Sequence, residues 1–166
     1  DPAHLYSIRF VITLDSDTQL PLDTARKMIE TLAHPLNQPR LDATGRILPG
    51  TYTIIQPRVT PSLPSTSASL FSRLFSEAVG IDPYTKAVSD INQDLTGEGS
   101  YHGKGIYDVR ALSRMLSGRF PEEWLLSHDL IEGAHVRVGL ASDIELIDEF
   151  PRDYLSYTSR QHRWIR

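Results

Sequence analysis

Hydrophobic and polar positions along this chain follow two spacings, and each spacing predicts a different secondary-structure element. Residues 8–14 form an apolar run of strand type, and residues 51–56 are rich in β-branched and aromatic side chains. Between these two runs, apolar residues recur at the spacing of a helix: Leu22, Ala25, Met28, Ile29 and Leu32. His34-Pro35 ends this helical stretch, since the residue before a proline disfavours helical backbone angles.

The remainder of the chain continues this alternation. We expect the following further elements: helices at 70–79, at 109–116 and from Ser127 to Gly139, and a strand at 144–150. Asp108 is the expected N-cap of one helix, and Gly80 and Gly118 are expected at helix C-termini. Loops are expected where proline, glycine and polar residues gather: 36–50, 57–69 and 81–107. Strands alternating with helices predict an α/β fold with a mixed or mainly parallel sheet.

Composition narrows the class of protein without identifying it. The 166 residues carry a formal net charge of -4, which supplies no overall basic field for nucleic acid. The absence of cysteine excludes disulfides, thiolate metal sites and a cysteine nucleophile. No apolar run approaches the roughly 18 residues of a membrane span. The length fits a single domain, and the missing initiator methionine leads us to expect a fragment of a larger protein.

Asp15 and Asp17 stand directly after the first predicted strand. In an open α/β sheet, ligands bind outside the carboxyl ends of the strands. Two carboxylates at that place suit Mg²⁺ or Mn²⁺, which proteins commonly hold with one or two carboxylates and the phosphates of a substrate. The Asp-x-Asp therefore predicts a cation that carries a nucleotide diphosphate. The alternative is an ordinary turn in which Asp17 or Thr18 caps the next helix.

Asp129, near the start of a predicted helix, has two interpretations. It can act as general base on a sugar hydroxyl, or its negative charge can stabilise the helix N-terminus. The segment from Gly97 to Gly105 is neither a P-loop nor a GxGxxG loop, because Glu98 and His102 stand where those patterns need glycine. It is a polar loop with one lysine, Lys104, which either closes over a ligand as a substrate-binding group or forms only a turn.

The basic and aromatic tail around Arg163 and Trp164 also has two interpretations. Arg163 can hold a diphosphate while Trp164 offers an apolar face to a sugar, or the pair can be an aromatic anchor among surface cations. The six histidines lack the HExxH spacing, which argues against a zinc site. No GxSxG segment supports a serine hydrolase.

Seven segments together resemble, in this order, the glycosyltransferase domain of the cyclic β-1,2-glucan synthases: LDSDTQLP, AHPLNQPR, QPRVTPSLPS, GIDPYTKAVSD, GEGSYHGKGIYDV, LLSHDLIEG and RQHRW. The resemblance covers nearly the whole chain. It implies a GT-A-like α/β fold, related to the processive, inverting transferases that make cellulose and chitin. It also implies a large multi-domain parent at the cytoplasmic face of the bacterial inner membrane, with its remaining domains as partners.

The resemblance further implies a reaction and a role for each matching residue. The reaction is the transfer of glucose from UDP-glucose, with inversion, to a growing β-glucan acceptor. Asp15 and Asp17 match the Asp-x-Asp that binds Mg²⁺ or Mn²⁺ and the UDP diphosphate. Asp129 matches the base on the acceptor hydroxyl. The motif that holds the acceptor end and the diphosphate is matched by three residues of the tail: Gln161, Arg163 and Trp164.

Two departures from the family pattern accompany this resemblance. The tail motif, Gln161-His162-Arg163-Trp164, is one residue shorter than the Gln-x-x-Arg-Trp of processive transferases. The residues before Ile8 are too few for the nucleotide-binding strand and uracil-binding aspartate of a GT-A enzyme. We therefore expect residues 1–166 to be the central part of a transferase domain, inactive when isolated.

Two other classes of protein stay open from the sequence. A noncatalytic carbohydrate-binding or scaffolding module of a glycan synthase or phosphorylase could keep such residues without turnover, although the intact set of acidic residues argues against it. A carbohydrate phosphorylase domain, which the same parents carry elsewhere, uses an (α/α)₆ barrel. The strand-rich pattern of this chain does not fit that barrel.

Overall fold

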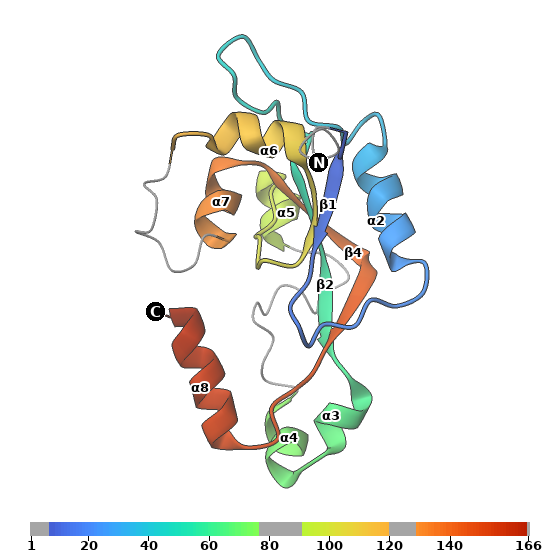
Figure 1. The fold of residues 1–166 in the computed structure, drawn as a ribbon, viewed down its shortest axis with the longest axis vertical. Coiled ribbons are helices and arrows are strands. Elements are labelled where there is room, and N and C mark those ends of the chain that lie inside the picture. Colours follow the sequence, from blue (N-terminus) through green and yellow to red (C-terminus); the bar gives the residue numbers. More distant parts are fainter. Residues whose placement is uncertain (1–6, 77–90, 120–128, 166) are drawn as a thin grey trace.

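A four-stranded mixed sheet organises the part of the chain that the computed structural model describes, which is residues 7–76, 91–119 and 129–165. The strand order is β1-β3-β2-β4, with these bounds: β1 Phe10–Thr13, β2 Ile54–Pro61, β3 Gly105–Asp108 and β4 Val138–Asp148. Strand β3 runs antiparallel to β1 and β2, whereas β2 and β4 are parallel. Strands β1, β2 and β4 therefore point the same way, and their carboxyl ends share one edge of the sheet (Figure 1).

Helices cover both faces of this sheet. Helix α2 (Thr24–Ala33) packs on one face, and α6 (Val109–Leu116) and α7 (Asp129–His135) lie on the other (Figure 1). Ile55 belongs to the buried cluster around Met28 and Leu32 of α2. Its neighbour Ile54 belongs to the second cluster, with Met115 of α6. Because successive side chains of a strand point to opposite faces, β2 supplies both halves of the core.

A group of short helices lies beyond the carboxyl edge of the sheet: α3 Leu63–Ser67, α4 Leu70–Phe75 and α8 Tyr154–Ile165 (Figure 1). Aromatic contacts join α4 to α8, since the ring of Phe71, which lies 4.9 Å from Phe75 in α4, is 6.2 Å from Phe150 and 5.9 Å from Tyr157 of α8. These contacts hold α8 near the carboxyl edge. Helix α5 (Ile91–Thr96) precedes β3. None of the helices in the described ranges has the length and apolar composition needed to cross a bilayer.

The predicted mixed α/β architecture is confirmed. The first strand, the helix that follows it and the helix at 109–116 are also confirmed, with shorter bounds for the first two. Asp108 caps α6 as predicted, because its Oδ1 accepts hydrogen bonds from the backbone N–H groups of Arg110 (3.1 Å) and Ala111 (3.0 Å). Helix α4 matches the first part of the helix predicted at 70–79, and Gly80 lies outside the described residues. The GT-A assignment stays a prediction.

The predicted end of the second strand at residue 56 is wrong. Strand β2 begins at Ile54 and continues through Pro57 to Pro61, and α3 follows it where a loop was expected. The register against β4 shifts between Pro57 and Arg58. A bulge is one of the few places where a sheet accepts proline, which explains how the strand continues through this residue.

The helix predicted from Ser127 to Gly139 is wrong in its second half. Helix α7 ends at His135, and β4 begins at Val138, six residues before the predicted strand. Val136 and Val138 are both buried, so alternation of strand type replaces helical spacing there. The loop expected at 81–107 contains α5 and β3 in its described part, and the unassigned tail forms α8. Strands β3 and β4 form by pairing with β2, and α8 is held by its aromatic contacts with α4.

Candidate active site

The candidate site forms where the carboxyl ends of β1, β2 and β4 meet. Asp15 and Asp17 follow β1, and Asp148 is the last residue of β4. Because β3 is antiparallel to β1, its first residue, Gly105, pairs with Thr13. Lys104, which precedes Gly105, therefore lies at the same edge of the sheet. The turn after β1 is fastened to β4 by two backbone hydrogen bonds between Gln19 and Ile147, of 2.7 Å and 3.2 Å.

Gly105 and Gln56 hold the loop that carries Lys104. A side chain at Gly105 would collide with the carbonyl oxygen of Ile55, and Gly105 has φ +156°. The amide of Gln56, which is fully buried, accepts a hydrogen bond from the backbone N–H of His102 at 3.0 Å. Gln56 also donates to the carbonyl of Pro57 at 2.8 Å. The loop therefore closes tightly against the end of β2.

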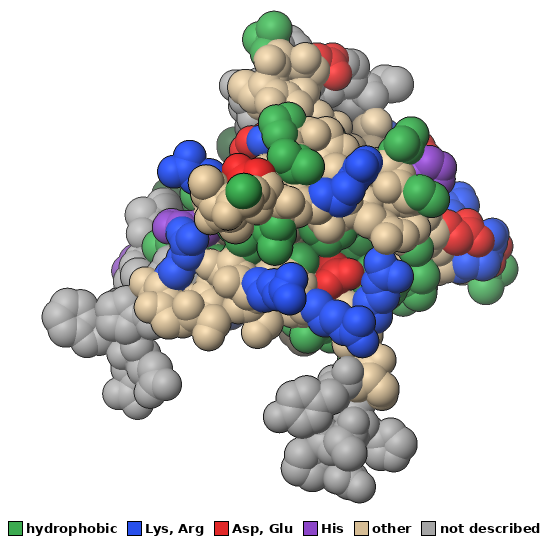
Figure 2. Space-filling model, turned by 90° about the horizontal axis from the view of Figure 1, so that it is seen from above, with side chains coloured by type: hydrophobic (Ala, Val, Ile, Leu, Met, Phe, Trp, Pro, Cys, Tyr) green, Lys and Arg blue, Asp and Glu red, His purple; other side chains and the backbone are tan. Residues whose placement is uncertain are grey.

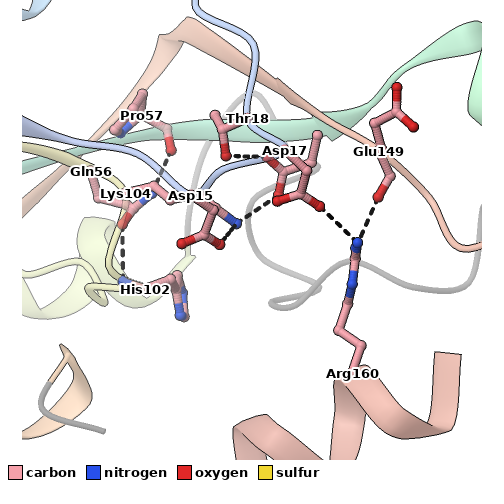
Figure 3. Close-up of polar contacts among 10 residues, drawn as sticks. Asp15, Asp17, Thr18, Gln56, Pro57, His102, Lys104, Glu149 and Arg160 are labelled. Atoms are coloured by element: carbon pink, nitrogen blue, oxygen red, sulfur yellow. Dashed lines mark hydrogen bonds and ion pairs between the residues drawn. The ribbon is translucent and has the colours of Figure 1, made fainter. Parts of the chain in front are cut away.

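Lys104 is the centre of an ion-pair cluster (Figure 3). Its ammonium lies 2.6 Å from Asp148 Oδ2 and 2.9 Å from Asp15 Oδ2. The hydroxyl of Thr18 donates to Asp148 Oδ1 at 2.6 Å. Burial lowers the pKa of Lys104, but hydrogen bonds to the two carboxylates outweigh burial and raise that pKa above its usual value. The lysine is therefore a permanent positive charge at neutral pH.

A second ion pair connects the turn after β1 with α8. The guanidinium of Arg160 lies 2.8 Å from Asp17 Oδ2 and donates to the carbonyl of Glu149 at 2.9 Å (Figure 3). A pocket of about 250 Å³ lies over both ion pairs and is almost wholly polar; its lining comprises Asp15, Ser16, Asp17, Lys104, Asp148, Arg160 and Arg163. The structure thus brings Asp15, Asp17, Lys104 and Arg163 together.

Asp129 lies beside this loop but does not line the pocket. It is the first residue of α7, and a Cβ built on Gly103 would be 2.7 Å from Asp129 Oδ2. Gly103 directly precedes Lys104, so the Asp129 carboxylate borders the loop that carries this lysine. Its position at a helix N-terminus is also the one that the capping interpretation requires.

Tyr101 joins the loop to β1. Its hydroxyl and Thr13 Oγ1 are 2.9 Å apart. Burial raises the pKa of Tyr101 to about 12, the Thr13 hydrogen bond opposes this shift, and the Asp129 and Glu132 carboxylates add to it. Tyr101 is therefore a neutral hydrogen-bonding group throughout the physiological range.

One predicted substrate-binding residue does not line the pocket, and the side chain of another is not described. Gln161 lies half-buried on α8, outside the pocket lining. The side chain of Trp164 lies outside the described residues.

Sequence reasoning missed Asp148 and Arg160. Asp148 ends an apolar strand-like run, as Asp15 does, and that similarity was a usable signal. Arg160 precedes Arg163 by three residues, so both lie on one side of a helix, but the helix itself had not been predicted.

The donor groups fit a divalent cation that keeps substrate phosphates among its ligands. Asp15 and Asp17 supply two hard carboxylate donors to one pocket, and Mg²⁺ is typically held by one or two such groups. In the described ranges, no group of three or more histidine, cysteine or carboxylate side chains is arranged to hold a metal ion. Any cation here would therefore depend on the diphosphate for the rest of its ligands.

Over 160 residues, the chain is 48% identical to the cyclic β-(1,2)-glucan synthase NdvB of Rhizobium meliloti (strain 1021). The chain is homologous to a segment of this synthase. The match covers 96% of the chain but only 6% of the synthase. No family model matches the chain. The resemblance seen in the sequence is confirmed at the level of the synthase, and the domain to which the segment belongs stays a prediction.

Proposed function

We propose that this chain is the glucosyltransferase segment of a cyclic β-1,2-glucan synthase and transfers glucose from UDP-glucose, with inversion, to a growing β-glucan. The observation that carries the proposal is the polar pocket at the carboxyl edge, where Asp15 and Asp17 meet Lys104 and Arg163. Three separate segments of the chain supply these charges. The homology with a cyclic β-(1,2)-glucan synthase supports glucan as the product.

Asp129 is the proposed general base in this reaction. An α-linked donor gives a β-linked product by one in-line displacement, which needs a base on the acceptor hydroxyl. The carboxylate borders the loop that carries Lys104, at Gly103. The acceptor therefore approaches along the α7 side of that loop, and Gln161 and Trp164 are the proposed acceptor contacts on α8.

Asp15 and Asp17 are the proposed ligands of Mg²⁺ or Mn²⁺. The bound cation would neutralise charge on the departing UDP. Arg163 and Lys104 provide fixed positive charge next to the same two carboxylates, where it stabilises the negative charge that develops on the diphosphate. The proposed partners are UDP-glucose, the glucan acceptor and the rest of the parent synthase at the cytoplasmic face of the membrane.

The test uses the full-length parent synthase. Asp129→Asn should reduce polymer formation by on the order of 10²–10⁴, because an amide cannot take the acceptor proton, while UDP-glucose binding persists. Asp17→Asn should instead weaken nucleotide binding. Asp143→Asn is the matched control, since Asp143 is an exposed carboxylate of β4 that lines a different pocket. Near-normal turnover in Asp129→Asn would leave the helix-capping role as the explanation of that residue.

A noncatalytic module is the second candidate, and one observation favours it. Asp15, Asp17 and Asp148 each have a cationic partner within 2.9 Å, as in a purely structural ionic cluster. In that case Asp17→Asn would lower the stability of the synthase without a selective loss of nucleotide affinity. Measuring both quantities on the same variant separates the two candidates.

A further inference from the structure

Lys104 is unusually enclosed for a lysine, with a side chain only 2% exposed. Burying an ammonium is costly unless carboxylates pair with it. Gly105 and Gln56 fix the loop that carries Lys104 against the end of β2. The ammonium of Lys104 is directed toward the carboxylates of Asp15 and Asp148 (Figure 3). The ammonium of Lys104 is therefore a permanent part of the site.

The two carboxylates that share Lys104 differ in their surroundings. The side chain of Asp148 is 11% exposed, contacts the ammonium at 2.6 Å and also accepts from Thr18. The side chain of Asp15 is 53% exposed, contacts the ammonium at the longer distance of 2.9 Å and faces the pocket. Asp148 is thus the anchored partner of the lysine, and Asp15 is the exchangeable one.

We infer that Lys104 is a resident counter-cation that competes with a divalent metal ion for Asp15, and that Asp148 sets the strength of this competition. The inference rests on the proposed role of Asp15 and Asp17 as metal ligands. A metal ion gains Asp15 only by displacing the ammonium. Asp148 lowers the cost of that displacement, because it keeps the lysine paired after Asp15 has turned to the metal.

This arrangement makes the site respond to substrate. An ammonium has three N–H donors, so release from Asp15 leaves Lys104 with a donor for another anion while Asp148 retains it. A diphosphate is an anion of the right charge, and it arrives together with the metal. Metal alone would therefore bind weakly, and metal with diphosphate would bind better than the sum of the two, through reciprocal coupling.

The decisive experiment is a Mn²⁺ titration of the chain without nucleotide, followed by water-proton relaxation. The double variant Lys104→Gln/Asp148→Asn leaves the net charge unchanged, replaces the buried ion pair by two amides and frees Asp15. Competition predicts tighter Mn²⁺ binding than in the wild type, by about threefold, the size expected for a half-exposed ion pair. Asp148→Asn alone should weaken binding, because Lys104 then pairs with Asp15 only.

Two controls make the outcomes distinguishable. Lys27→Gln/Asp143→Asn makes the same two charge changes at exposed positions and should leave Mn²⁺ affinity unchanged. Asp17→Asn should remove binding in every background. If the double variant binds Mn²⁺ no more tightly than the wild type while Asp17→Asn still removes binding, the competition is overturned and the metal site survives. If Asp17→Asn retains full affinity, both the competition and the proposed metal site are overturned.

Discussion

The paired strands β1 and β3 have aspartates at both ends of the pair, and the aspartates at the two ends differ in exposure and in their partners. At the amino end of β1, Asp108 is 5% exposed, and its two oxygens are divided between the backbone of α6 and Arg9, at 3.3 Å. At the carboxyl end, Asp15 and Asp17 are 53% and 37% exposed and are held by the side-chain cations Lys104 and Arg160. Asp108 caps helix α6, whereas the carboxylates of Asp15 and Asp17 line a pocket.

The surroundings of the two ends sharpen this contrast. A cleft of about 580 Å³ lies at the amino end, where Arg9, Arg110 and Arg114 surround Asp108. Figure 2 looks onto this end of the molecule and shows basic side chains gathered around an acidic one. The carboxyl-end pocket balances three aspartates with one lysine and two arginines. Asp108 thus combines a helix cap with one ion pair, whereas side-chain cations hold the aspartates of the carboxyl end.

The largest expected effect on stability lies at Tyr101, which joins the carboxyl-end loop to β1. Its pKa is raised to about 12 in the folded chain, so its contribution is fully present below pH 10 and is lost as the pH rises toward 12. The two-unit difference corresponds to roughly 2–3 kcal/mol in the free energy of unfolding. Urea unfolding of Tyr101→Phe and wild type from pH 9 to 12 measures this.

The wild type should lose stability more steeply than Tyr101→Phe across that pH range. Tyr154→Phe, on the exposed part of α8, is the matched control and should follow the wild type. Parallel curves for Tyr101→Phe and wild type would mean that the phenol ionises as easily in the folded chain as in the unfolded chain.

Asp108→Ala should have the next largest effect. Loss of this cap leaves two backbone N–H groups of α6 without their acceptor and should cost about 1–2 kcal/mol in the free energy of unfolding. Thermal and urea unfolding measure the loss, and Asp108→Asn should recover most of it because asparagine is also a good N-cap. Mn²⁺ affinity should not change. A change in that affinity would break the proposed separation between the two ends.

Local chemistry in the sequence was sufficient for some elements and for part of the site. The cap at Asp108 and the strand that ends before Asp15 need only neighbouring residues, and both are confirmed. The ion pair between Lys104 and Asp15 could not be predicted from neighbouring residues in the sequence. It depends on β3 pairing antiparallel with β1, which joins residues about ninety positions apart.

The errors share one physical cause, which is pairing between distant segments. Pro57 reads as the end of a strand unless the bulge against β4 is known. Asp148 lies inside the strand predicted at 144–150, and nothing local indicates that the lysine of another loop contacts it. Arg160 needs α8, and α8 is placed by aromatic contacts with α4 through Phe71. Tertiary context therefore decided which charged residues became part of the site.

Asp15→Ala should have the smallest effect on stability and the most selective effect on metal binding. Its ion pair with Lys104 is half-exposed, and such pairs contribute at most about 1 kcal/mol. Asp148 keeps Lys104 paired in the variant, which limits the loss further. We therefore expect urea unfolding within about 0.5 kcal/mol of the wild type, and Mn²⁺ binding reduced to the level of Asp17→Asn. A loss of stability as large as that of Asp108→Ala, with Mn²⁺ affinity intact, would make Asp15 a structural residue like Asp108 and remove the distinction between the two ends.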